Sequence, residues 1–481
     1  MKRLNERLGT MSMNRRSFIK STAEGVAGAT LAGSAIKSVI AKPMANDFAW
    51  TDKMPINPDI DNMRVICMHD PNMTGTPTGG TFAAQNKVVD DQRVRDNLDK
   101  MAMHLTGKAT PDEAWKTIFR SSKAWKDTKV IIKLNCVANN MLARVSVIKK
   151  ITDVLIDFGV QPANIVMFDG QGQYRGPNGT YKSSVSLTDN TKIRAKLSDS
   201  YSDLGGSAAV KIPEINNSGY APGDLVKGNT DIIVNIAVNK GHASPTFNVG
   251  MTTLCLKNHF GTFLNASSNG TAMHLHSTKG LININKIPEI VGGNPIRQQL
   301  CIVDSLWAMK SGPTGSVDGG KLDRLVMGTF AGSVDYCCVK EIREKLMNVT
   351  NHQKDVIPQF LTAFGYKETD PEWVEMTPDT VAIRKVNPNH SSESITFTLN
   401  GSSMPKSTLH FNLPRGNRDN LTVRIVDMKG RVVREINERS GVWTLQWDGR
   451  AANGNMVAPG SYMVSLSAGS FRETMQMTVV R

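Results

Sequence analysis

Several common protein classes are excluded by what the sequence lacks. None of its six cysteines forms a C-x-x-C pair, so the usual iron–sulfur and zinc-ribbon patterns are absent. The net charge of +14 is spread along the chain without a long basic run, which argues against nucleic-acid binding. The sequence also contains neither a G-x-S-x-G turn nor a catalytic Cys–His signature. No segment is long and apolar enough for a transmembrane helix in the mature chain.

The composition of the 481-residue chain is typical of a globular protein, with 40% hydrophobic and 21% charged residues. A chain of this length predicts two or three domains. The cysteines lie mostly in apolar runs, such as V-I-C-M, which is typical of buried free thiols. A core of this size needs neither disulfides nor metals to fold.

Residues 1–41 have the pattern of an export signal. The run S-M-N-R-R-S-F-I-K at residues 12–20 resembles the twin-arginine motif, and a short Gly/Ala-rich stretch follows it. Val39-Ile40-Ala41 is the favoured cleavage site, with Pro43-Met44-Ala45 as the alternative. The resemblance implies the twin-arginine translocase as a partner during export. It also implies that the mature chain lies in the periplasm or at the cell surface.

Apolar strand patterns alternate with helical patterns from residue 60 to residue 378. The expected strands are Arg64–Met68, Thr128–Asn135, Asn164–Asp169, Asp231–Ala237, Leu300–Asp304 and Leu325–Phe330. The expected helices are Asp90–Leu105, Pro111–Ser121, Ala143–Phe158, Val334–Met347 and Asp355–Phe364. Continuous apolar strands alternating with helices predict an α/β domain with a mainly parallel sheet and helices on both faces.

A different pattern begins after this domain. Residues 379–395 have the composition of a linker. Residues 396–481 contain short strand patterns separated by turns, which predicts a small C-terminal β-sandwich.

The stretch from Asn239 to His276 holds four of the nine histidines of the chain. Asn248 is a good N-cap and Gly261 a good helix stop, so a helix is expected between them. The four histidines cannot meet through local structure alone. They can meet only if loops beyond the strand ends fold over a common rim, as parallel α/β architecture allows. Those histidines are His242, His259, His274 and His276.

Polar residues at the expected carboxyl ends of strands extend this candidate site, because ligands of such sheets bind there. His242, His274 and His276 are candidate ligands of a divalent transition metal, since imidazole binds such ions well. His259 and Asp304 are candidates for acid/base catalysis. The candidate ligand-binding residues are Lys133, Asn135, Lys240, Lys257 and Asn258.

Two functions stay open at this point. One is a metal- or cofactor-dependent enzyme, hydrolytic or redox, with His259 or Asp304 as the acid/base. The other is a non-catalytic envelope or cell-surface protein that binds an anionic ligand through its lysines. A small molecule is the expected partner in both cases, and the cofactor stays unknown.

Two resemblances add to this interpretation. The runs Lys133-Leu134-Asn135, Lys240-Gly241-His242, K-N-H-F-G at 257–261 and Ile302-Val303-Asp304 resemble the family of domain of unknown function 362. This resemblance implies a fold and a site but no settled reaction. Many members carry iron–sulfur modules, for which this chain lacks the cysteines. The C-terminal run V-A-P-G-S-Y at 457–462 resembles the immunoglobulin-like domain of the flagellar hook-capping protein, and the layout resembles type 9 secretion tails.

Overall fold

The structure is a computed structural model, and it describes most of the chain from residue 49 onward. The described residues are 49–137, 141–170, 193–198, 200–215, 219–242, 252–265, 277–312, 317–352, 354–378, 397–400, 407–411, 421–427, 430–438, 444–447, 449–458, 460–468 and 471–479. The expected export signal and linker lie outside these residues.

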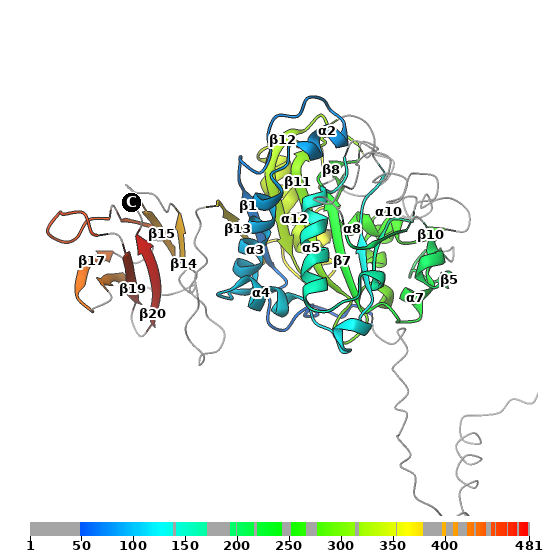
Figure 1. Cartoon of the computed structure of the whole chain (residues 1–481), viewed down its shortest axis with the longest axis horizontal. Coiled ribbons are helices and arrows are strands. Elements are labelled where there is room, and N and C mark those ends of the chain that lie inside the picture. The colour runs from blue at the N-terminus through cyan, green and yellow to red at the C-terminus, as the bar shows by residue number, and fades with distance from the viewer. Residues whose placement is uncertain are drawn as a thin grey trace, which may run out of the picture. The chain divides into compact units, whose positions relative to one another are not determined.

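An eight-stranded sheet forms the centre of the α/β part (Figure 1). Five neighbouring pairs are parallel, and only the two pairs made by β12 are antiparallel. The prediction of a mainly parallel sheet is therefore confirmed. The strand order is β13 (Glu372–Met376), β1 (Arg64–His69), β12 (Gly320–Gly328), β11 (Gln298–Ala308), β7 (Ile232–Val238), β2 (Val130–Lys133), β3 (Ile165–Phe168) and β4 (Lys196–Ser198).

Helices α3 and α4 form where the sequence predicts them, and their N-terminal amides have local acceptors. The side chain of Asp90 accepts from Arg93 N at the start of α3, and Thr110 accepts from Glu113 N at the start of α4. The helices along the chain are α2 (Phe82–Lys87), α3 (Asp91–Thr106), α4 (Pro111–Ile118), α5 (Val145–Asp157), α7 (Gly223–Val226), α8 (Cys255–Asn258), α10 (Ser277–Ile284), α11 (Pro288–Val291), α12 (Ala331–Cys337) and α13 (Gln359–Thr362). A π-helical segment, Cys338–Glu344, continues α12.

Alternate residues of the strands belong to different hydrophobic clusters. In β1, Ile66 and Met68 belong to the cluster that includes α3, α4 and α5. Val65 and Cys67 belong to the cluster that includes α8, α12 and α13. Successive side chains of a strand point in opposite directions, so this alternation is what a sheet with two buried sides requires. Figure 1 shows α3 and α5 in front of the strands.

Shorter strands surround the candidate site. β8 (Lys240–Gly241) pairs with β9 (Thr252–Thr253), and a three-stranded sheet contains β5 (Ser207–Val210), β6 (Gly219–Pro222) and β10 (Leu264–Asn265). The sequence predicts none of these strands, because each is too short to show a periodic pattern.

The helix expected between Asn248 and Gly261 is wrong at residues 252–253, which form β9, and α8 begins only at Cys255. Residues 248–251 lie outside the described residues. The carboxylate of Asp335, on α12, accepts hydrogen bonds from Cys255 N and Leu256 N, both at 2.8 Å. A residue distant in sequence therefore provides the acceptors at the start of this helix, which local capping rules cannot foresee.

The described C-terminal strands form two antiparallel sheets. One contains β14 (Phe397–Asn400), β15 (Ser407–Phe411) and β18 (Thr444–Trp447). The other contains β17 (Val432–Glu438), β16 (Leu421–Asp427), β19 (Gly460–Ala468) and β20 (Phe471–Val479). The rings of Trp447 and Tyr462, one from each sheet, meet edge to face with centroids 6.3 Å apart. Contact between the two sheets is what a sandwich requires, while its exact boundaries stay predictions.

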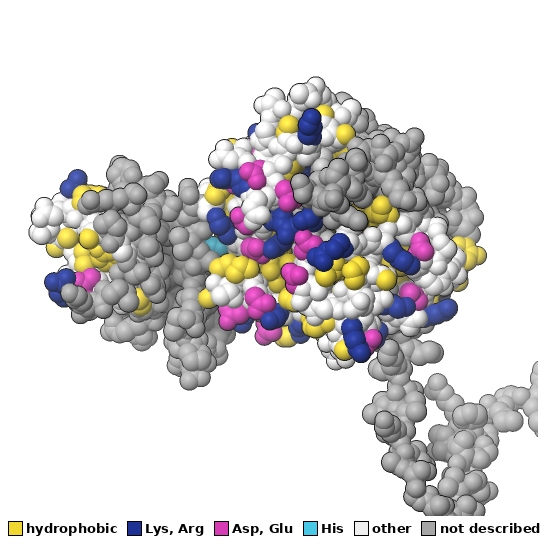
Figure 2. All heavy atoms as spheres, in the orientation of Figure 1, with side chains coloured by type: hydrophobic (Ala, Val, Ile, Leu, Met, Phe, Trp, Pro, Cys, Tyr) yellow, Lys and Arg dark blue, Asp and Glu magenta, His cyan; other side chains and the backbone are white. Residues whose placement is uncertain are grey.

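Charges of both signs intermingle on the face of the α/β part drawn in Figure 2. Partly exposed ion pairs of the α/β part include Lys150–Asp99 and Arg95–Asp153. Among the helices of the described residues, none has both the length and the apolar character needed to cross a membrane.

Candidate functional site

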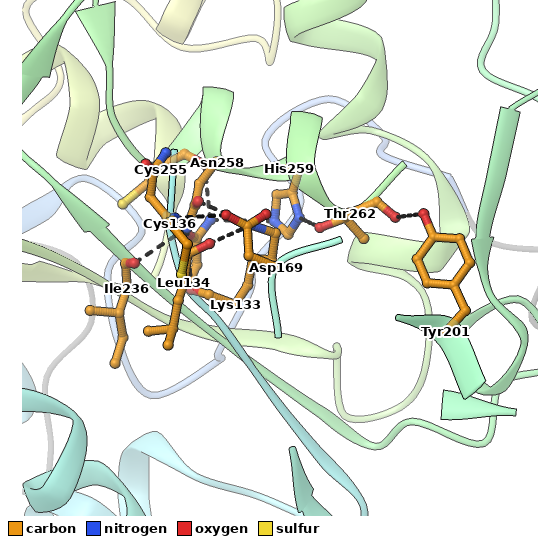
Figure 3. A network of polar contacts seen from close by, with 12 residues as sticks. Lys133, Leu134, Cys136, Asp169, Tyr201, Ile236, Cys255, Asn258, His259 and Thr262 are labelled. Carbon is orange, nitrogen blue, oxygen red and sulfur yellow. Dashed lines mark hydrogen bonds and ion pairs between the residues drawn. The ribbon is translucent and has the colours of Figure 1, made fainter. Parts of the chain in front are cut away.

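A buried ion pair lies at the carboxyl ends of β2 and β3. The Nζ of Lys133, the last residue of β2, donates to Asp169 Oδ1 and to Asn258 Oδ1, each at 3.2 Å (Figure 3). It also donates to the Leu134 carbonyl. The other oxygen of Asp169 accepts from Cys136 N at 2.7 Å. Because every oxygen of this carboxylate is bound, Lys133 and Asp169 form a fixed, mutually neutralising pair.

Asn258 connects helix α8 to the sheet. Its Nδ2 donates to Asn235 Oδ1 at 2.8 Å and lies 3.2 Å from the Lys133 carbonyl. Asn235, inside β7, donates in turn to the Cys255 carbonyl at 2.9 Å and to Gln298 Oε1 at 3.0 Å. The two carboxamides thus fix α8 against the ends of β2 and β7, so that the residues of α8 keep a defined position.

His259 follows directly and has partners on both ring nitrogens. Its Nε2 lies 2.6 Å from Gln298 Oε1, and its Nδ1 lies 3.0 Å from Thr262 Oγ1. The Gln298 oxygen only accepts, so Nε2 carries the proton and Nδ1 accepts from the Thr262 hydroxyl. Burial lowers the pKa of His259 to about 3, so the ring is neutral. The Tyr201 hydroxyl continues this series of hydrogen bonds, because it donates to the Thr262 carbonyl at 2.9 Å (Figure 3).

Two further lysines lie in the same region, and their amino groups have fewer hydrogen-bond partners than that of Lys133. Lys240, in β8, is completely buried and donates to Asn135 Oδ1. Burial lowers the pKa of Lys240 to about 7. Lys257, in α8, is 9% exposed, and its Nζ lies 4.8 Å from the ring centroid of Phe260. Among the residues that the structure describes, no acceptor forms a hydrogen bond with this Nζ.

The environment of Lys257 disfavours its positive charge. Burial lowers its pKa to about 7, and the charges of Lys240 and Lys133 lower it further, while Asp169 acts in the opposite direction. Three lysine side chains therefore share one carboxylate in a buried region. An unpaired buried charge is costly, and the lowered pKa values of Lys240 and Lys257 are the expected consequence.

Glycines allow the backbone to approach the ion pair. Gly170 N donates to the Gly261 carbonyl at 2.8 Å. A Cβ atom at Gly261 would lie 2.0 Å from Asp169 Oδ1 and 3.0 Å from Lys133 Nζ. The glycine that ends the K-N-H-F-G run is therefore required by this close approach rather than by helix termination alone.

Asp304 does not join the lysines through any hydrogen bond of the described residues. One of its oxygens accepts from Arg144 N at 2.6 Å and the other from Leu306 N at 3.1 Å. Burial raises the pKa of Asp304, while the Arg144 guanidinium lowers it. This carboxylate holds the chain at the start of α5. The proposal that it acts in catalysis stays a prediction.

The histidines proposed as metal ligands are only partly placed. His242 is buried and lines a cavity of about 370 Å³ together with Lys310, Ser311 and Asp318. The lysines of the site are not among the lining residues of this cavity. His274 and His276 lie outside the described residues. Within those residues, no group of three or more His, Cys, Asp or Glu side chains is arranged to hold a metal.

Sequence reasoning missed several residues that organise the site. Asp169, which pairs with Lys133, was expected as a polar residue at the end of an apolar strand but was not among the candidate site residues. Asn235 and Gln298 lie inside strands, and Asp335 lies inside a helix, where a polar residue has no distinguishing pattern. Their roles depend on contacts between segments that are distant in the sequence.

Two parts of the chain match known families. Residues 130–340 match the family described as "Domain of unknown function (DUF362)", and this range contains all the site residues described above. Residues 392–470 match the "FlgD Ig-like domain". Both resemblances inferred from the sequence are supported at the level of these domains.

Two curated relatives match a short stretch of the chain. The basal-body rod modification protein FlgD of Salmonella typhimurium is 47% identical over 53 residues, which cover 10% of this chain and 23% of that protein. The FlgD protein of Salmonella typhi matches to the same extent. The chain therefore spans less than a quarter of the length of these relatives.

Similarities to solved structures are also partial. PorZ, a bacterial surface component of the type-IX secretion system of Porphyromonas gingivalis, is 23% identical, with 18% of this chain and 11% of PorZ covered and a TM-score of 0.15. A polysaccharide deacetylase from Bacillus cereus is 12% identical, with 18% and 30% covered and a TM-score of 0.15. These values are too low to support an argument about fold.

Proposed function

We propose that Lys133, Lys240 and Lys257 form a binding site for the anionic group of a small molecule. The observation that carries this proposal is Lys257, a residue that is only 9% exposed and whose Nζ has no hydrogen-bond acceptor among the described residues. Lys133 is already paired with Asp169, and Lys240 has one amide oxygen as its partner. A carboxylate or phosphate at Lys257 would supply the missing acceptors and the missing negative charge.

Burial makes this site selective for an anion. Carboxamide and backbone groups position Lys133 and Lys240 before a ligand arrives, so little entropy is lost by these two side chains on binding. The low dielectric around them strengthens attraction to a negative group. A bound anion also raises the pKa of Lys257 again, so that binding is accompanied by proton uptake near neutral pH.

Isothermal titration with oxalate and with inorganic phosphate tests the proposal. Lys257→Met, which keeps the length of the side chain and removes its charge, should weaken binding about tenfold to a hundredfold, because a hydrogen bond to a charged group contributes about 1.5–3 kcal/mol. Lys279→Met is the matched control, since that lysine is 64% exposed and pairs with Glu214 at the surface. Equal affinities in wild type and Lys257→Met would refute the anion site.

An enzymatic role and a metal stay predictions from the sequence. They depend on His274 and His276, which the structure does not describe, and on His259 and Asp304, whose described bonds are internal to the fold. Elemental analysis of natively exported protein, compared with His274→Ala and His276→Ala, would test the metal directly. Metal content that is substoichiometric and unchanged in both variants would count against it.

Export is the second part of the proposal. The Arg15-Arg16 pair supports it, and the match to a FlgD Ig-like domain points to an extracytoplasmic protein. We expect Arg15→Lys combined with Arg16→Lys to leave the precursor in the cytoplasm, as measured by cell fractionation. Normal export of this double variant would contradict a twin-arginine signal.

A further inference from the structure

The cavity that His242 lines is separate from the lysine site, because none of Lys133, Lys240 and Lys257 lines it. Its volume of about 370 Å³ lies at the lower end of the range of small-molecule sites, about 300–1,000 Å³. All the described residues that line it, except Val349, are polar or charged, and none of them is Phe, Tyr or Trp. A ligand of this cavity is therefore small and polar rather than apolar.

Arg343, which is completely buried, holds the walls of this cavity together. Its guanidinium donates to the carbonyls of Met309 and Lys310 at 3.0 and 2.9 Å, and its own carbonyl accepts from Val349 N at 2.8 Å. Gly241, which precedes His242, also lies against this wall, because a Cβ atom there would collide with the Lys310 carbonyl oxygen. The fold therefore sets the shape of the cavity before a ligand arrives.

The charges at the cavity favour a ligand with one negative group. The third acceptor of Arg343 is Asn239 Oδ1, at 2.8 Å, so all its partners in the described structure are neutral, and its Nε is buried without a partner. The ammonium of Lys310, which lines the cavity, also has no partner among the described residues. The one lining carboxylate, Asp318, already accepts from Ser311 Oγ at 2.6 Å and from Lys310 N at 2.7 Å. Two cations therefore outweigh one carboxylate, and a cavity of this charge attracts an anion.

We propose that this cavity binds a sugar acid, which is a ring with several hydroxyl groups and one carboxylate. The carboxamides of Asn348 and Asn351 and the hydroxyl of Thr350 line the cavity, and none of them forms a hydrogen bond within the described residues. A carboxamide both donates and accepts hydrogen bonds, as a sugar hydroxyl does, and the Asp318 carboxylate can accept from a further hydroxyl. The Lys310 ammonium would pair with the carboxylate of the ligand. This site goes beyond the proposed anion site, because it has its own residues and selects for hydroxyl groups.

Isothermal titration of the full-length protein with D-glucuronate, D-glucose and acetate tests the inference. Glucose has the hydroxyl groups without the charge, and acetate has the charge without the hydroxyl groups. We expect D-glucuronate to bind at least about tenfold more tightly than either, because it alone makes both kinds of contact. Equal affinity for D-glucuronate and acetate, or for D-glucuronate and D-glucose, would overturn the sugar-acid site. Absence of D-glucuronate binding would overturn it as well.

Two lysine variants locate the binding. Lys310→Met should weaken D-glucuronate binding about tenfold and leave oxalate binding unchanged. Lys345→Met is the matched control, because it removes the same charge from an exposed lysine that pairs with Glu341 and does not line the cavity. Lys257→Met should leave D-glucuronate binding within about twofold of wild type. A loss of D-glucuronate binding in Lys257→Met but not in Lys310→Met would place the ligand at the lysine site and overturn this inference, while the anion site stays intact. The three ligands compared on wild type decide the outcome even where a variant fails to fold.

Discussion

Charged side chains occupy different places in the α/β part and in the C-terminal strands. The α/β part buries Lys240 and Asp304 almost completely. In the described C-terminal strands, the ion pair Arg424–Glu435 lies largely in solvent. The residues buried there are hydrophobic or aromatic, such as Val423, Val464 and Trp447. Surface ion pairs of this kind contribute little to stability, whereas each buried charge must be compensated.

The comparison separates two kinds of buried charge. Asp304 and Asp335 are compensated by backbone N–H groups, so their role follows from the fold. Lys257 has no such partner in the described structure, and it lies beside two other lysines. An uncompensated buried charge lowers the stability of the fold. Such charges are common in functional sites. In the described C-terminal strands no lysine, arginine, aspartate or glutamate is buried as a whole residue, although Nε of Arg434 is buried without a hydrogen-bond partner.

Removing a compensated buried charge should have the largest effect on stability. Asp304→Ala leaves Arg144 N and Leu306 N without acceptors, so we expect the free energy of unfolding to fall by about 3 kcal/mol. Urea denaturation measures this change. If Asp304 acts only through the fold, the variant that stays folded should bind oxalate within about twofold of wild type. A much larger loss of affinity would show that Asp304 takes part in ligand binding.

The close approach at Gly261 gives a smaller but more local test. Gly261→Ala places a Cβ atom against Asp169, and we expect a loss of about 2 kcal/mol in the free energy of unfolding. Gly79→Ala is the control, because no atom lies within 4 Å of a Cβ at that position. Equal stability of the two variants would show that the ion pair is less tightly enclosed than described.

Deleting the C-terminal strands tests whether the two parts are independent. A chain that ends near residue 385 should fold and bind oxalate within about twofold of the full-length protein, because the α/β part has its own core. Proteolysis should cut between about residues 378 and 395, where the composition is typical of a linker. Unfolding or aggregation of the truncated chain would contradict this independence.

The smallest effect is expected at the surface of the C-terminal strands. Arg424→Ala and Glu435→Ala, singly or together, should leave the thermal midpoint unchanged within error, because both side chains are screened by solvent. Differential scanning calorimetry provides the measurement. A clear destabilisation by either substitution would mean that these strands also depend on specific charge pairs.

Much of the α/β fold could be predicted from the sequence, because long apolar strands and amphipathic helices follow local patterns. Strand β7 and helix α3 form within one or two residues of their expected bounds. The antiparallel insertion of β12 between β1 and β11 could not be foreseen, since its pairing with β1 joins segments that are distant in sequence, although β11 and β12 are consecutive strands. The late start of α8 was not predicted either. The acceptors for its first N–H groups come from Asp335, which is distant in the sequence.

The site was predictable in its residue types but not in its connections. Lys133 and Lys240 were expected at strand ends and Lys257 in the last turn of a helix, and the charges of Lys240 and Lys133 lower the pKa of Lys257. The partners of His259 were not expected, because Gln298 lies in a neighbouring strand and Thr262 beyond the expected helix end. Spacing along the chain indicates which side chains reach one edge of a sheet. Only the packed structure shows which of them already have partners.

The pH dependence of oxalate affinity tests the anion site most directly. Oxalate is fully ionised between pH 6 and pH 8, so any change in affinity over this range belongs to the protein. Because the pKa of Lys257 is lowered to about 7 and the anion binds its protonated form, we expect affinity to fall about tenfold from pH 6 to pH 8. In Lys257→Met the affinity should be weaker and the pH dependence smaller. Affinity that rises with pH, as metal binding by histidines would, or that does not change, would contradict the account.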